Sequence, residues 1–186
     1  MVLLAIHAAR GEWATAAYCL IPILSFALGV MVTEGIRARA PHRAGVHWQR
    51  SVLLLEASIL GVVGFLPHGV PDAVVNVAVS FLCAMQVNGF RTVMGLPYAS
   101  TMCTGNLRSC SQHLWQYFFG GDREAGAKAW RYLAVILTFC LGAGLGIPLT
   151  SLLGDRAALL GAVVLLGVWL RLLVDVPAID KASPLG

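Results

Sequence analysis

The chain has 186 residues, of which 58% are apolar and 12% are charged, and its formal net charge is +4. A soluble domain is typically about 45–50% apolar and about 25% charged, so this composition excludes an ordinary soluble domain and indicates a multi-pass membrane protein. A spanning helix takes about 20 residues, which leaves room for about five spans and little else. The basic residues lie between the apolar runs, so we expect a lipid bilayer as partner and no nucleic acid.

The five cysteines form no CxxC pair, and an odd number without a framework argues against structural disulfides. The histidines are scattered as well, so we expect no metal and no cofactor. We also expect no enzyme, because the reactive side chains lie on different segments without a catalytic spacing. These side chains are Glu56, Cys103, Cys110 and His113.

Residues 1–13 are apolar and compatible with a helix, but they are too few to span a bilayer. We expect them to lie along the membrane surface. The first span is predicted over 14–36 and should bend at Pro22, because proline removes one backbone hydrogen bond. Glu34 lies near the end of this span, and we interpret it as a solvated helix end rather than a functional carboxylate.

A basic loop precedes a second, shorter span predicted over 51–66. Glu56 lies inside this span, about one and a half turns from its start. A carboxylate there costs about 3 kcal/mol unless it is paired or reached by water. Glu56 is therefore a functional carboxylate, the structural partner of a neighbouring helix, or a shallow position. The loop contains Arg37, Arg39, His42, Arg43, His47 and Arg50, and a tight turn over 67–72, with His68, follows the span.

The third span, predicted over 73–93, is apolar but carries amides and an arginine in its second half. Such groups are costly at membrane depth unless they are buried in protein or line a cavity. Asn88 and Arg91 are three residues apart, so we expect them on one helix face. Arg91 is either a site residue or an interfacial anchor.

Gly95, Pro97 and Gly105 predict that the third helix breaks. An amphipathic helix, interfacial or re-entrant, is predicted over 107–119, with Thr104 and Asn106 as caps of its first turn. We expect the functional site at this broken helix. The expected site residues are Gln86, Asn88, Arg91, Thr101, Thr104, Gly105 and Asn106, with Glu56 as a further intramembrane carboxylate.

After a polar turn over 120–128, two more spans are predicted over 129–153 and 157–174, and a loose tail over 175–186. Gly142 and Gly146 form a GxxxG pattern, which allows close helix contact. Arg171 and Asp175 are spaced as an ion pair. The predicted fold is an all-α transmembrane bundle of about five spans, with one broken helix followed by an amphipathic helix.

The basic residues place the 37–50 loop and the C-terminus in the cytoplasm by the positive-inside rule. Residues 24–29 (LSFALG) resemble 137–142 (LTFCLG), and on this orientation the two copies run in opposite directions. We therefore expect inverted repeats within a single domain, an incomplete first repeat over 1–66 and a second over 73–174. Inverted repeats with broken helices are typical of transporters.

Residues 85–91 (MQVNGFR) and 98–108 (YASTMCTGNLR) resemble the YoaK family of bacterial inner-membrane proteins, as do 9–30 and nearly the whole chain. The resemblance implies a multi-pass protein of the bacterial cytoplasmic membrane, without naming an activity. Members of that family typically have a further N-terminal helix with a second Thr-Gly-Asn-like motif. This chain is expected to lack that helix.

Two functions follow from these patterns. The leading hypothesis is a permease for a small polar or anionic solute, bound by the polar residues of the broken helix. The alternative is a non-transporting scaffold or regulatory subunit, which would dock a partner through the GxxxG face and the amphipathic helix. A homodimer is a further expected partner, because a second copy would cover the face left by the missing helix.

Overall fold

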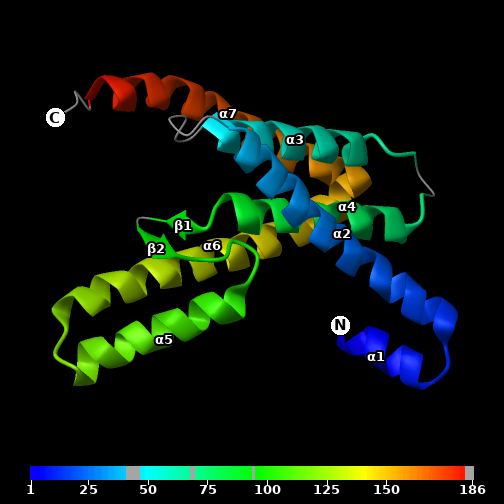
Figure 1. The fold of residues 1–186 in the computed structure, drawn as a ribbon, viewed down its shortest axis with the longest axis horizontal. Coiled ribbons are helices and arrows are strands. Elements are labelled where there is room, and N and C mark those ends of the chain that lie inside the picture. The colour runs from blue at the N-terminus through cyan, green and yellow to red at the C-terminus, as the bar shows by residue number, and fades with distance from the viewer. Residues whose placement is uncertain (41–46, 68–69, 94, 183–186) are drawn as a thin grey trace. The chain divides into compact units, whose positions relative to one another are not determined.

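The computed structural model describes residues 1–40, 47–67, 70–93 and 95–182, and Figure 1 shows their fold. Among these residues every element except one short hairpin is a helix, which confirms the predicted all-α class. The predictions for His42, Arg43, His68 and the last four residues fall outside the described residues. In chain order the elements are α1 (Val2–Ala9), α2 (Trp13–Arg39), α3 (His47–Gly64), α4 (Asp72–Gly89), β1 (Thr92–Val93), β2 (Leu96–Pro97), α5 (Cys103–Phe119), α6 (Arg123–Leu153), the 3-10 turn η1 (Gly154–Arg156) and α7 (Ala157–Ala182).

Four of the described helices are long and apolar enough to cross a membrane, namely α2, α4, α6 and the 157–174 part of α7. They agree with four of the five predicted spans and indicate a multi-pass membrane protein. The fifth, predicted over 51–66, forms a helix as α3 but is not among these four. Gln49, Arg50 and Glu56 lower the hydropathy of α3, so its path across the bilayer remains a prediction.

The contacts divide the chain into two compact units. The first unit contains Met1–Gly89 and Asp155–Gly186, and the second contains Phe90–Gly154. These bounds do not follow the predicted repeats over 1–66 and 73–174, so the inverted repeats and the single-domain organisation stay predictions. Each unit is described by itself below.

In the first unit, α2 packs closely against α4 around Gly29. A Cβ added to Gly29 would lie 2.6 Å from the carbonyl oxygen of Phe81 and 2.8 Å from the Cβ of Ala84. The Ser25 hydroxyl donates to the Val77 carbonyl oxygen at 2.8 Å and adds a polar tie between the two helices. Glycine at position 29 is therefore what allows this close approach.

The same unit pairs α3 with α7. A Cβ added to Gly64 would lie 2.6 Å from the Leu159 side chain, and one added to Gly161 would lie 3.2 Å from Leu60. At the other end of the pair, the Arg50 guanidinium donates a hydrogen bond to the Leu172 carbonyl oxygen. Small residues thus set the spacing of this helix pair as well.

The second unit is built on α5 and α6, which lie side by side and are joined by a short turn (Figure 1). Cys110, Ala129 and Tyr132 form its core. Helix α6 begins at Arg123 rather than at the predicted residue 129. The reason is Asp122, whose carboxylate accepts hydrogen bonds from the backbone N–H groups of Glu124 and Ala125 and caps the helix.

The predicted break in the third span is present, but its bounds differ from the prediction. Helix α4 ends at Gly89, and β1 and β2 then form an antiparallel hairpin that turns at Gly95, where φ is 78°. Arg91 therefore lies outside the helix, and the prediction that it shares a helix face with Asn88 is wrong. Local turn chemistry ends the helix four residues before residue 93.

Helix α7 continues to Ala182, so the tail predicted to be loose from residue 175 is helical in its first part. Pro177 lies inside this helix, and the residues after it include good helix formers such as Ala178 and Ala182. The ion pair predicted between Arg171 and Asp175 involves a side chain outside those that the structure describes.

The glycine face of α6, formed by Gly142 and Gly146, meets nothing else in the second unit, and neither does Gly144 on another side of the helix. A Cβ added at any of the three would find nothing within 4 Å. Around it the large apolar side chains Leu141, Leu145 and Ile147 are exposed. The GxxxG pattern therefore makes no helix contact within the described residues of the second unit.

Candidate functional site

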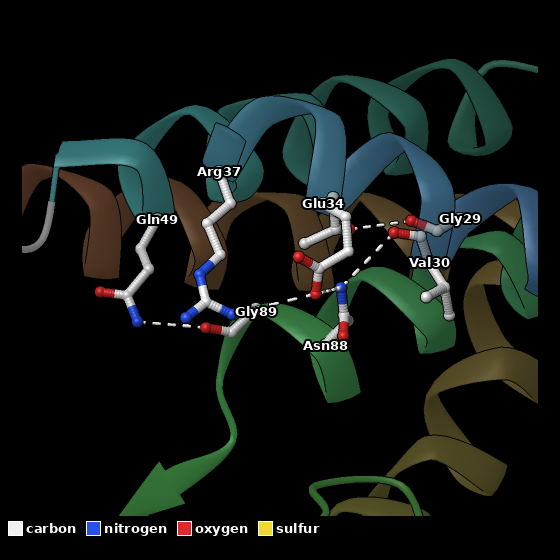
Figure 2. Close-up of polar contacts among 8 residues, drawn as sticks. Gly29, Val30, Glu34, Arg37, Gln49, Asn88 and Gly89 are labelled. Atoms are coloured by element: carbon white, nitrogen blue, oxygen red, sulfur yellow. Dashed lines mark hydrogen bonds and ion pairs between the residues drawn. The ribbon is translucent and has the colours of Figure 1, made fainter. Parts of the chain in front are cut away.

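The polar residues of the first unit gather around the C-terminal half of α4, where three helices meet. Asn88 is 6% exposed, and its side-chain amide donates to Glu34 Oε1 at 3.0 Å and to the Val30 carbonyl oxygen at 3.4 Å. Figure 2 shows Glu34 on α2 and Asn88 on α4 pointing toward each other. A buried amide that meets a carboxylate in this way is a strong, charge-assisted contact.

Glu34 is a member of this cluster that the sequence analysis did not single out. Its side chain is 44% exposed near the end of α2, as expected for a solvated helix end, but it also contacts Asn88 and lies 3.9 Å from the Arg37 guanidinium. The contact with Asn88 is the part that the sequence analysis did not predict. The i,i+3 spacing of Glu34 and Arg37 was the signal available in the sequence.

The end of α4 is held by a side chain from α3. The last carbonyl groups of a helix have no partner within it. Gln49 donates to the Gly89 carbonyl oxygen at 3.1 Å and satisfies one of them, as Figure 2 shows. On α2, the buried Thr33 hydroxyl donates to the Gly29 carbonyl oxygen at 2.8 Å. A side chain of α3 therefore fixes the end of α4 at the site.

Glu56 and Gln86, both predicted site residues, are brought together between α3 and α4. The Gln86 amide donates to Glu56 Oε2 at 2.6 Å. Glu56 is 1% exposed, and its other oxygen, Oε1, has no hydrogen-bond partner among the described residues. Of the sequence alternatives for Glu56, the shallow position is wrong, since α3 and its neighbours bury the carboxyl group.

The remaining predicted site residues belong to the second unit. Arg91, Thr104 and Gly105 are exposed, and Thr101 is half-buried. Asn106 is 3% exposed, and its amide accepts from the Ala99 N–H at 3.2 Å and donates to the Ala99 carbonyl oxygen at 2.7 Å.

The predicted capping by Thr104 and Asn106 is wrong. Helix α5 begins at Cys103, and its N-cap is Met102, which makes no side-chain capping bond. Asn106 therefore lies within the first turns of α5 and holds the preceding loop at Ala99. Its role in the described structure is to fix that loop, not to cap the helix.

The second unit also contains a groove of about 670 Å³ beside α6, lined by Tyr98, Ser100, Trp130, Arg131 and Phe139 among others. None of the predicted site residues lines it. In the same unit, the Tyr132 hydroxyl donates to the Pro97 carbonyl oxygen at 2.7 Å. Burial raises the pKa of the Tyr98 phenol and of the Cys110 thiol, which keeps both groups neutral.

The first-unit cluster can hold a polar group by hydrogen bonds and can exchange protons through its carboxyl groups. Its side chains are carboxyls, amides, one hydroxyl and one guanidinium, with no nucleophile paired to a base. Among the described residues, no group of three or more His, Cys, Asp or Glu side chains could hold a metal ion. Binding and proton exchange are therefore the chemistry that this arrangement supports.

The chain belongs to the family described as "Protein of unknown function (DUF1275)", whose sequence profile matches residues 1–171. Families of the YoaK type are DUF1275 families, so the resemblance seen in the sequence is supported at this level. No curated protein and no solved structure matches the chain.

Proposed function

We propose that this DUF1275 protein is a permease for a small polar solute rather than an enzyme, and that the cluster on α2, α3 and α4 is its binding site. It would act in the bacterial inner membrane as a protein of the YoaK type, with its C-terminus in the cytoplasm. The observation that carries the proposal is the pair of polar contacts that α4 makes on its two sides, Gln86 with the buried Glu56 of α3 and Asn88 with Glu34 of α2, in a unit otherwise built from apolar helices.

Polar side chains are rare inside membrane helices, and they commonly mark the paths of substrates and ions. Here the four side chains come from three helices and form two contacts, on different sides of the last two turns of α4. The contacts favour a neutral or cationic polar solute, because the side chains that meet Asn88 and Gln86 are acidic. An anionic solute would depend on Arg91, which lies in the second unit.

Flux through the purified chain in liposomes tests the proposal. Stopped-flow swelling with glycerol and urea, and with nitrate as the anionic probe, should exceed that of protein-free liposomes for at least one probe. Gln86→Met and Asn88→Leu keep the side-chain volume but remove hydrogen bonds worth about 1.4 kcal/mol, so each should lower that flux about tenfold. Thr138→Val, at an exposed site on α6, should leave it unchanged.

Equal swelling of protein-loaded and empty liposomes for every probe would contradict the permease proposal.

The second candidate function, a membrane scaffold, is favoured by the open glycine face of α6. A second copy of the chain is the simplest occupant of that face. Gly142→Leu should then lower the mass measured by light scattering in detergent from that of a dimer to that of a monomer.

A further inference from the structure

We propose that Glu56 is the proton-exchanging carboxyl group of this protein, neutral in the structure seen here, and that its Oε1 gives up and takes back the proton. The inference rests on the proposed function, because a permease that carries a proton with its solute needs one such group. It goes further in naming the coupling ion and the atom that binds it.

The first support is the geometry of the carboxyl group. Its Oε2 accepts a hydrogen bond from Gln86 at 2.6 Å, while Oε1 has no partner in the described part of the chain. In the neutral acid the carbonyl oxygen is a good acceptor for an amide, and the proton sits on the other oxygen. Because Oε2 accepts this hydrogen bond, Oε1 is the oxygen that would carry the proton of the neutral acid.

The second support is the lack of a compensating charge. A buried carboxylate is costly unless it is paired with a cation or accepts several hydrogen bonds. Among the described residues, no lysine, arginine or histidine forms an ion pair with Glu56. Val52, Leu53 and Ala57 on its own helix are buried as well, so the part of α3 around Glu56 is apolar. The neutral form is the one that this environment stabilises.

The titratable and charged groups on the surrounding helices are otherwise engaged. On α4, Cys83 is close enough to interact electrostatically with Glu56. On α2, Glu34 contacts Asn88 and lies near Arg37. On α3 itself, Arg50 is directed to the Leu172 carbonyl oxygen of α7, and Arg171 on α7 is exposed. None of these supplies an ion pair to Glu56.

Glu34 provides a matched comparison within the same unit. It also accepts a hydrogen bond from an amide of α4, at 3.0 Å, but it is 44% exposed and lies 3.9 Å from a guanidinium. Both features stabilise the ionised form. The two glutamates should therefore differ in protonation although both contact an α4 amide.

Dicyclohexylcarbodiimide distinguishes the two forms, because it reacts with a protonated carboxyl group in an apolar environment. The carboxyl oxygen bonds to the central carbon of the reagent and the acid proton moves to its nitrogen. The O-acylisourea so formed rearranges to a stable N-acylurea, with no other reactant. Mass spectrometry then identifies the modified glutamate in the full chain, reconstituted in liposomes.

We expect the reagent to modify Glu56 at least about tenfold faster than Glu34, and the rate at Glu56 to fall as the pH rises from about 6 to about 9. Glu56→Asp should keep a modified site on α3, whereas Glu56→Gln should lose it without losing helical circular dichroism. Equal modification of Glu34 and Glu56, or a rate at Glu56 that does not change with pH, would overturn the inference.

The outcome separates this inference from the proposed function. Modification needs no solute, so a reactive Glu56 in a protein without flux would leave the proton site standing and remove the permease. Flux for a neutral probe with an unreactive Glu56 would support the permease and remove the proton site. If both hold, a pH gradient should let the wild-type chain accumulate the probe by up to about tenfold per pH unit of gradient, and the Glu56→Gln chain should give no accumulation.

Discussion

Replacing Asn106 with alanine should release the loop before α5 and lower the free energy of unfolding of the second unit by about 2–4 kcal/mol. The Asn106 amide makes two hydrogen bonds to Ala99, one with its N–H and one with its carbonyl oxygen. Alanine removes both, and the two backbone groups of Ala99 then lose their partners beside a buried position. Each unpaired group contributes about 1–2 kcal/mol of that loss.

Hydrogen–deuterium exchange gives a local measurement of this effect. The Ala99 amide should exchange at least about tenfold faster in the Asn106→Ala chain than in the wild-type chain. Thr104→Ala is the matched control, because Thr104 lies two residues earlier on α5 and is exposed. Unchanged exchange at Ala99 in Asn106→Ala would show that other contacts hold the loop.

Replacing Gly29 with alanine should force α2 and α4 apart. Gly29→Ala adds one methyl group, which would lie 2.6 Å from the Phe81 carbonyl oxygen. The oxygen belongs to the backbone, so relief requires a shift of a whole helix and costs about 1–3 kcal/mol. The melting temperature in detergent should fall by roughly 5 °C.

A glycine-to-alanine substitution on α6 is the control, and it should not lower the melting temperature. A Cβ at Gly142 meets nothing within 4 Å, and alanine is a better helix former than glycine by about 0.5–1 kcal/mol. Gly142→Ala should therefore leave the melting temperature unchanged or raise it slightly. If both alanine variants behave alike, the close α2–α4 contact does not limit stability.

Local patterns in the sequence predict the helices of this protein well. Long apolar runs locate α2, α4, α6 and α7, and glycine with proline locates the break after α4. These signals depend only on residues near one another in the chain. Helix ends are less well predicted, because a single cap such as Asp122 moves the start of α6 by six residues.

The candidate site is predicted only in part, because its contacts join distant parts of the chain. The amides Gln86 and Asn88 stand out in an apolar helix and are correctly singled out as polar groups that need partners. Their partners cannot be read from spacing, since Glu56 and Glu34 lie 30 and 54 residues away. The contact between Glu34 and Asn88 was not predicted for this reason.

The two amides also have a mechanical consequence for α4. Gln86 and Asn88 are two positions apart, so their side chains leave the helix axis about 200° apart. One is bound to α3 through Glu56 and the other to α2 through Glu34. Turning α4 about its own axis would break both bonds together, which gives the helix one preferred angular setting. The two bonds therefore link α4 to α3 on one side and to α2 on the other.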